Sequence, residues 1–139
     1  MGVTITANNS KHSFHMGYRG FFELRKNIAL AYNKEFGKQY AKLAHCYTKE
    51  DYKEYNNKTN RLIRKLELED DDILDFLYSN DCGGKASHKT CGKMYKFLTN
   101  ADLSGKRFQY AAWSSESDYD EFKEFLHECY SHRRNMVWL

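Results

Sequence analysis

The chain has 139 residues, of which 41% are hydrophobic and 16% are aromatic, and it contains no proline. This length and composition exclude an intrinsically disordered protein and predict a single domain over residues 1–139 with a core of its own. The formal net charge is only +3, from 22 basic and 19 acidic residues. Because the two signs alternate along the chain, the sequence does not favour nucleic acid as a partner.

The start of the chain and its cysteines favour a cytoplasmic protein. The first residues have neither the basic nor the apolar region of a signal peptide, and no run of about 18 apolar residues predicts a membrane-spanning helix. The four cysteines include no Cys-x-x-Cys pair, so we expect reduced thiols. The strongest zinc candidate, Cys82 with His88 and Cys91, lacks this spacing, and we expect no metal.

The first 44 residues predict one strand and two helices. Residues 3–7 alternate β-branched side chains, which is typical of a strand. We expect a polar loop over 8–13 and an irregular segment over 14–20. Apolar residues then recur with helical spacing over 21–32 and again over 36–44.

The middle of the chain predicts three helices separated by turns. A capping box, in which Thr48 is followed three residues later by Asp51, predicts a long helix to residue 66. Consecutive aspartates favour the start of a short helix over 70–77. Residues 80–84 end that helix, and Ser87 caps another that extends to about residue 98.

The last third predicts a strand, a helix and a closing strand. After a loop over 100–106, residues 108–113 are the second strand candidate. Apolar residues at helical spacing predict the last helix over 119–129, and residues 136–138 form a third strand. The fold class is therefore α+β: a mostly helical domain of about five helices with a small sheet from the two chain ends and a middle segment.

A glycine-containing block near the N-terminus is the first candidate binding site. Gly17 and Gly20 precede a helix, where backbone N–H groups and the helix dipole favour an anion. Around them lie the polar, aromatic and cationic candidates Ser10, Tyr18, Arg19 and Arg25. The alternative is structural, because the same glycines permit a sharp turn that anchors the helix to the core.

The C-terminal tail is the second candidate binding site. Adjacent arginines follow the last helix, and arginine is well suited to gripping phosphate. The candidate ligand residues are His132, Arg133, Arg134, Asn135 and Trp138. The alternative is that the cations complement the helix dipole and that the tail is locked into its own core.

No pattern in the chain specifies a catalytic centre. His45 and Cys46 are adjacent, and neighbouring residues of a helix point about 100° apart, so the imidazole is poorly placed to activate the thiol. His132 beside the arginines could act as an acid or base on a phosphodiester. We therefore expect no catalytic residue and no cofactor, and keep a small phosphodiesterase or ribonuclease as the less favoured alternative.

Two blocks of the chain resemble small proteins of phages and mobile elements in Gram-positive bacteria. The first is Asn9-Ser10-x-x-Ser13-Phe14-x-Met16-Gly17-Tyr18-x-Gly20-Phe21-Phe22-x-Leu24-Arg25-x-x-Ile28-Ala29. The second is Asp118-Tyr119-x-Glu121-Phe122-Lys123-x-Phe125-Leu126-x-x-Cys129-Tyr130-Ser131-His132-Arg133-Arg134-Asn135-Met136-Val137-Trp138. The resemblance carries no established activity. It implies a setting, because accessory phage proteins of this size often look like inhibitors of host defence.

Together these features predict a phage-type anti-defence protein that binds a small phosphorylated nucleotide signal and sequesters it without catalysis. In this interpretation both end blocks converge on one pocket that holds a cyclic nucleotide or a cyclic ADP-ribose-like molecule. A homo-oligomer could supply such a pocket from two copies of the chain. The alternative is a protein–protein inhibitor that docks a host defence protein through tyrosines such as Tyr47, Tyr52, Tyr55, Tyr119 and Tyr130.

Overall fold

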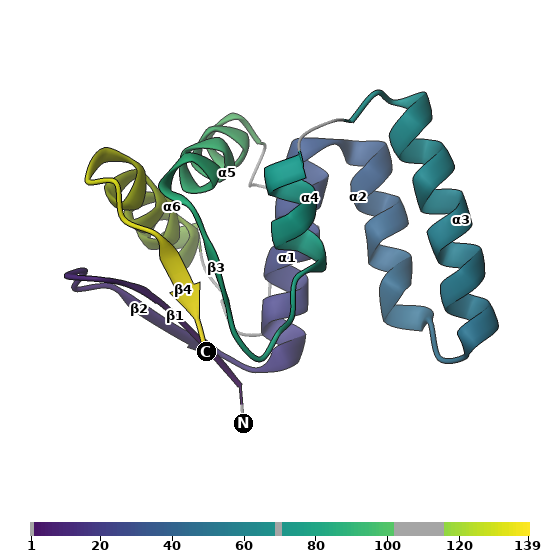
Figure 1. Ribbon diagram of the computed structural model, residues 1–139. Coiled ribbons are helices and arrows are strands. Elements are labelled where there is room, and N and C mark those ends of the chain that lie inside the picture. Colours follow the sequence, from purple (N-terminus) through teal and green to yellow (C-terminus); the bar gives the residue numbers. More distant parts are fainter. Residues whose placement is uncertain (1, 69–70, 102–115) are drawn as a thin grey trace.

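Figure 1 shows the computed structural model, which describes residues 2–68, 71–101 and 116–139. These residues form a single α+β domain, as predicted. Its elements, in chain order, are β1 (Val3–Ala7), β2 (Ser13–Met16), α1 (Tyr18–Tyr32), α2 (Lys34–Ala41), the 3-10 helix η1 (Lys42–His45), α3 (Lys49–Lys65), α4 (Asp71–Tyr78), β3 (Gly84–Ala86), α5 (His88–Asn100), α6 (Glu116–Ser131) and β4 (Met136–Trp138).

The four strands form one antiparallel sheet in the order β2-β1-β4-β3. The C-terminal strand β4 lies between β1 and β3, so Trp138 pairs with Ile5 on one side and with Gly84 on the other. Alternate residues of β1 and β4 are buried, which is the pattern of a sheet with one covered face. The predicted strands over 3–7 and 136–138 are confirmed.

The helices lie on one side of the sheet (Figure 1). Helices α5 and α6 lie close to the sheet, and α1, α2 and α3 follow one another away from it, with α3 outermost. Helix α2 continues through Gly37. The residue there must be small because it lies directly against α1, and a Cβ would come within 2.5 Å of the Leu30 Cα. The predicted helices are confirmed, and the segment over 36–44 divides into α2 and η1.

Two strands differ from the sequence prediction. Residues 13–16 were expected in a loop and an irregular segment, yet they form β2, in which Phe14 and Met16 are buried and the residues between them are exposed. Residues 84–86 were expected in or near a turn, yet they form β3. This strand comes from the middle of the chain and lies at one edge of the sheet, next to β4. Both strands are short, so few residues carry the alternating pattern. The strand predicted over 108–113 lies outside the described residues.

Trp138 is a central residue of the core. Its side chain is 0% exposed, and its indole N–H donates to the Asn80 carbonyl oxygen at 2.8 Å. The ring lies 5.9 Å from Phe21 and 5.5 Å from Phe76, measured between ring centroids. Gly84 makes room for it, because a Cβ at that position would come within 2.4 Å of the Trp138 Cζ2 atom. The indole therefore joins the C-terminus to α1, α4 and β3.

The buried guanidinium of Arg25 lies beside this tryptophan. It donates to the Asp81 carboxylate at 2.7 Å and to the Ser79 hydroxyl at 2.8 Å. Its charged carbon lies 4.1 Å from the Phe21 ring centroid and 5.7 Å from that of Trp138. Burial lowers the pKa of Arg25, and the Asp81 charge acts in the opposite direction. Arg25 thereby fixes the segment after α4, which also accepts the indole hydrogen bond.

We predict that Arg25→Lys lowers the free energy of unfolding by about 1–2 kcal/mol, because one ammonium group cannot replace both guanidinium nitrogens that donate to Asp81 and Ser79. Urea unfolding followed by circular dichroism measures this change. Arg19→Lys is the matched control, because Arg19 is exposed on the same helix, and it should be neutral. Equal unfolding midpoints for the two variants would show that Arg25 does not anchor the segment.

Candidate functional site

The nine ligand residues predicted from the sequence lie in three separate places. Arg25 and Trp138 are buried in the core. Tyr18 and Arg19 are exposed at the start of α1, where the Tyr18 hydroxyl lies 4.0 Å from the Cys82 Sγ. The other predicted residues, in the β1–β2 turn and in the tail, are Ser10, His132, Arg133, Arg134 and Asn135.

The core pair is not available to a ligand in this structure. The Trp138 ring has no exposed surface, so a base could stack on it only if β4 left the sheet. Arg25 is 3% exposed, and both of its terminal nitrogens already have oxygen partners. Arg25 and Trp138 therefore stabilise the core. They do not line a common ligand site with the tail arginines in this structure.

The β1–β2 turn and the C-terminal tail do meet, around a hollow of about 630 Å³. Its lining includes Asn8, Asn9, Arg133, Arg134 and Asn135. The Arg134 side chain donates to the Glu128 carboxylate at 3.0 Å and to the Asn9 carbonyl oxygen at 3.2 Å. Its charge is therefore paired, and its role here is to hold the turn against α6. Ser10 lies in the same turn, where its hydroxyl accepts from the His12 N–H.

Arg133 differs from Arg134 in backbone and in exposure. Its φ is 54°, and the chain around it forms the two hydrogen bonds of a Schellman motif: Arg134 N to Cys129 O at 2.8 Å, and Arg133 N to Tyr130 O at 3.4 Å. Glycine is the usual residue at this left-handed position. The exposed Arg133 side chain therefore occupies a place where the backbone alone would favour glycine.

A second hollow, of about 980 Å³, lies between α5 and α6, and Arg133 lines it as well as the first. We call it the α5–α6 groove. Its cationic lining residues are Lys89, Lys93, Lys96 and Arg133, and its aromatic residues are His88, Tyr95, His127 and Tyr130. The sequence pattern alone does not predict this groove. Its three lysines recur at i, i+4 and i+7 on the polar face of the helix predicted over 87–98, which is also the pattern of a solvent-exposed helix face.

Close packing of two antiparallel helices shapes the groove. Gly92 on α5 lies against Tyr130 on α6, and a Cβ on Gly92 would come within 2.5 Å of the Tyr130 ring. One turn further along, the Tyr95 and His127 rings lie 5.0 Å apart at 54°. A glycine inside a helix costs about 1 kcal/mol relative to alanine, and here its missing side chain allows the Tyr130 ring to rest on the helix backbone.

The charge of the groove is one-sided. None of the described residues that line it is acidic. Lys93 pairs with Asp72 of the neighbouring helix α4 at 3.3 Å. Within the described ranges, no carboxylate lies within ion-pair distance of Lys89, Lys96 or Arg133. These three cations are exposed or line the groove without an acidic partner among the described residues.

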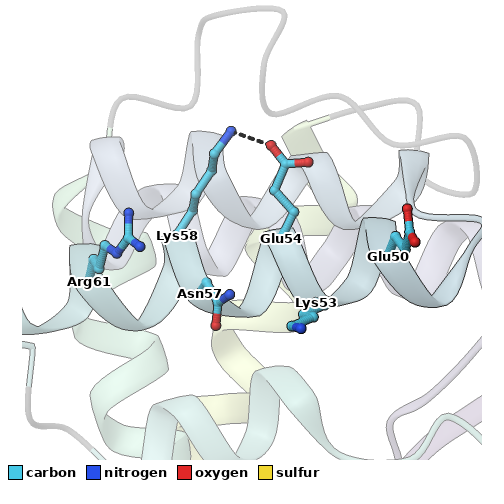
Figure 2. A pocket seen from close by; sticks show the side chains of 6 residues that line it. All are labelled: Glu50, Lys53, Glu54, Asn57, Lys58 and Arg61. Carbon is cyan, nitrogen blue, oxygen red and sulfur yellow. Dashed lines mark ion pairs between the residues drawn. The ribbon is translucent and has the colours of Figure 1, made fainter.

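A further hollow lies along α3, and its described lining contains both acidic and basic groups (Figure 2). The described residues that line it all come from this helix: Glu50, Lys53, Glu54, Asn57, Lys58 and Arg61. Lys58 pairs with Glu54 at 2.8 Å, one helical turn away. Two carboxylates thus accompany three cations on this face, whereas the described groove lining has no carboxylate, so this face provides a control surface for the groove.

The thiols near the groove do not provide a reactive group. Cys91 and Cys129 are fully buried between α5 and α6, and the hydrogen bond between them raises the pKa of the Cys91 thiol and lowers that of Cys129. Neither side chain has exposed surface, so neither thiol is accessible to a substrate. Burial also raises the pKa of Cys46, whereas a nucleophilic thiol needs a lowered pKa. Among the residues that the structure describes, no group of three or more metal-binding side chains could hold a metal ion.

Comparisons with protein-family models, with curated proteins and with solved structures found no match. Over the described ranges, no helix is both long and apolar enough to cross a membrane.

We predict that Arg133→Gly raises the free energy of unfolding by about 0.5–1 kcal/mol, because relief of the left-handed backbone outweighs the added freedom of the unfolded chain. Urea unfolding measures it. Glu67→Gly is a matched control, since Glu67 also has φ 54° in a Schellman motif, after α3. A loss of stability in Arg133→Gly alone would mean that the arginine side chain is structural.

Proposed function

We propose that the protein binds a phosphate-bearing nucleotide in the α5–α6 groove and sequesters it without chemical change. The observation that carries this proposal is the composition of the described lining: four cations and two tyrosines, with no carboxylate. Phosphate is the common biological group that needs several cations at once. An apolar metabolite would desolvate Lys89, Lys96 and Arg133, which have no acidic partner among the described residues, and a metal cation would be repelled.

The side chains of the groove fit the two parts of a nucleotide. Lysine and arginine bind phosphate oxygens, and Arg133 can do so with two parallel N–H groups. The Tyr95 and Tyr130 rings offer faces on which a base can stack. At the end of α5, Thr99 and Asn100 supply polar groups that can bond to the edge of a base.

Binding without reaction is the activity that these side chains support. His127 has the Tyr95 ring as its neighbour. In the described part of the groove, neither histidine is hydrogen-bonded to a hydroxyl or thiol that it could activate, and the buried Cys91 faces α6. The resemblance to phage proteins gives this binding a purpose: removal of a nucleotide signal of host defence from the cytoplasm.

A protein–protein inhibitor is the second candidate function, and exposed aromatic residues favour it. Tyr47 is 80% exposed and Tyr52 is 46% exposed, near the start of α3. Tyr55, by contrast, is buried, and its hydroxyl lies 2.7 Å from that of Tyr78. Helix α3 and the groove helix α6 lie on opposite sides of the domain in Figure 1, so a partner docked on α3 would leave the groove free.

We predict that isothermal titration of the protein with cyclic AMP, cyclic di-AMP and ADP-ribose at low salt detects binding of at least one of them. The double variant Lys89→Gln/Lys96→Gln should weaken this binding at least about tenfold, which corresponds to about 1.4 kcal/mol. The matched control is Lys53→Gln/Lys58→Gln, which removes the same charge from α3. The ligand recovered after heating should be intact.

Three results would contradict the proposal. The first is no binding of any of these ligands at millimolar concentration. The second is equal loss in the α3 control, which would mean that net charge rather than the groove is responsible. The third is a chemically altered ligand after incubation, which would make the protein an enzyme.

A further inference from the structure

We infer that the ligand of the α5–α6 groove is a linear chain of nucleotides, a short single-stranded oligonucleotide, rather than a mononucleotide. This inference rests on the proposed function, because it assumes that the groove binds phosphate. It follows from three features of the groove: the spacing of its lysines, the positions of its tyrosines and its exposed walls.

The lysines form a row along α5. Lys89, Lys93 and Lys96 lie on one stripe of the helix, and all three line the groove. At 1.5 Å rise per residue they are spaced by about 6 and about 4.5 Å along the helix axis. The two outer lysines have no acidic partner among the described residues, whereas Lys93 between them pairs with Asp72. The phosphates of a mononucleotide are bonded to one another or to one ribose, so they gather at one point. Phosphates separated by whole nucleotides match a row of cations that extends along a groove.

The tyrosines repeat along the same direction. Tyr130 rests on Gly92, and Tyr95 lies three residues further along α5. Tyr130 is 53% exposed, so much of its ring is available to a ligand. Two rings about one helical turn apart can each stack on one base, and stacking accepts any base because every base has a π face. Proteins that bind single strands combine such rings with a cationic groove.

The walls of the groove are exposed rather than enclosing. Lys89, Lys96, Tyr130 and Arg133 are all exposed residues. Pockets for small ligands bury about 70–90% of the ligand surface, whereas the described lining of this groove leaves it open to solvent. A single-stranded oligonucleotide can bind to such a groove with one side of its backbone on the cations and some of its bases stacked on the tyrosines.

The test is fluorescence anisotropy with 5′-fluorescein-labelled oligothymidylates of one, two, four and six nucleotides at 50 mM salt. We expect affinity to rise up to about four nucleotides, to exceed that of labelled thymidine monophosphate at least tenfold, and then to level off. A plot of log K against log salt concentration should have a slope of about −2, from about three phosphate contacts. Tyr130→Leu should weaken binding of the tetramer at least fivefold, whereas Tyr52→Leu on α3 should not.

The possible outcomes separate this inference from the proposed function. If thymidine monophosphate or the small ligands titrated above bind as tightly as the tetramer, the linear ligand is wrong and the phosphate-binding groove stands. If a hairpin duplex binds more tightly than the tetramer, the single-stranded ligand is wrong. If Tyr130→Leu and Tyr52→Leu weaken binding equally, the stacking role is wrong. If no phosphate-bearing ligand binds, both proposals fail.

Discussion

The burial of Trp138 against Gly84 is the constraint on which the rest of the structure depends. The indole can occupy the core only because residue 84 has no side chain, and its N–H reaches the Asn80 carbonyl oxygen at 2.8 Å. This contact holds β4 between β1 and β3. The core therefore holds β4 through Met136 and Trp138, both of which are fully buried.

A fixed C-terminal strand in turn determines the path of the residues before it. Helix α6 ends at Ser131 and β4 begins at Met136, so the chain must reverse within four residues. The Schellman motif makes that reversal and places Arg133 in the left-handed region. Arg134 then pairs with Glu128 and holds the β1–β2 turn, which leaves Arg133 beside the groove. Two adjacent arginines therefore differ: Arg134 is paired and holds the turn, whereas Arg133 is exposed.

The sequence predicts most of the fold because its long elements carry strong local signals. The capping box at Thr48 is present, with Asp51 accepting from the N–H groups of Tyr47 and Thr48. The short strands β2 and β3 were missed, since three or four residues carry little periodicity and their pairing depends on residues far along the chain. A sheet that contains both chain ends was predicted, and the pairing of β1 with β4 confirms it.

The candidate site was harder to predict than the fold. Arg25 and Trp138 have the residue types of a nucleotide site, but only the tertiary structure shows that they lie in the core. In the other direction, Lys89, Lys93 and Lys96 look like an ordinary solvated helix face until α6 is packed beside them. A residue type indicates which chemistry is available. The packing of neighbouring elements decides whether that side chain faces solvent, lines a groove or lies in the core.

The claim that a phosphate-bearing ligand binds between α5 and α6 is tested most directly by nuclear magnetic resonance. Amide signals of ¹⁵N-labelled protein would be followed while unlabelled tetrathymidylate is added at low salt. The account predicts saturable shifts at Gly92, Tyr95, Tyr130 and Arg133, with the signals of α3 unchanged. Saturable shifts confined to Asn9 and Arg134, or to α3, or the absence of any saturable shift, would contradict it.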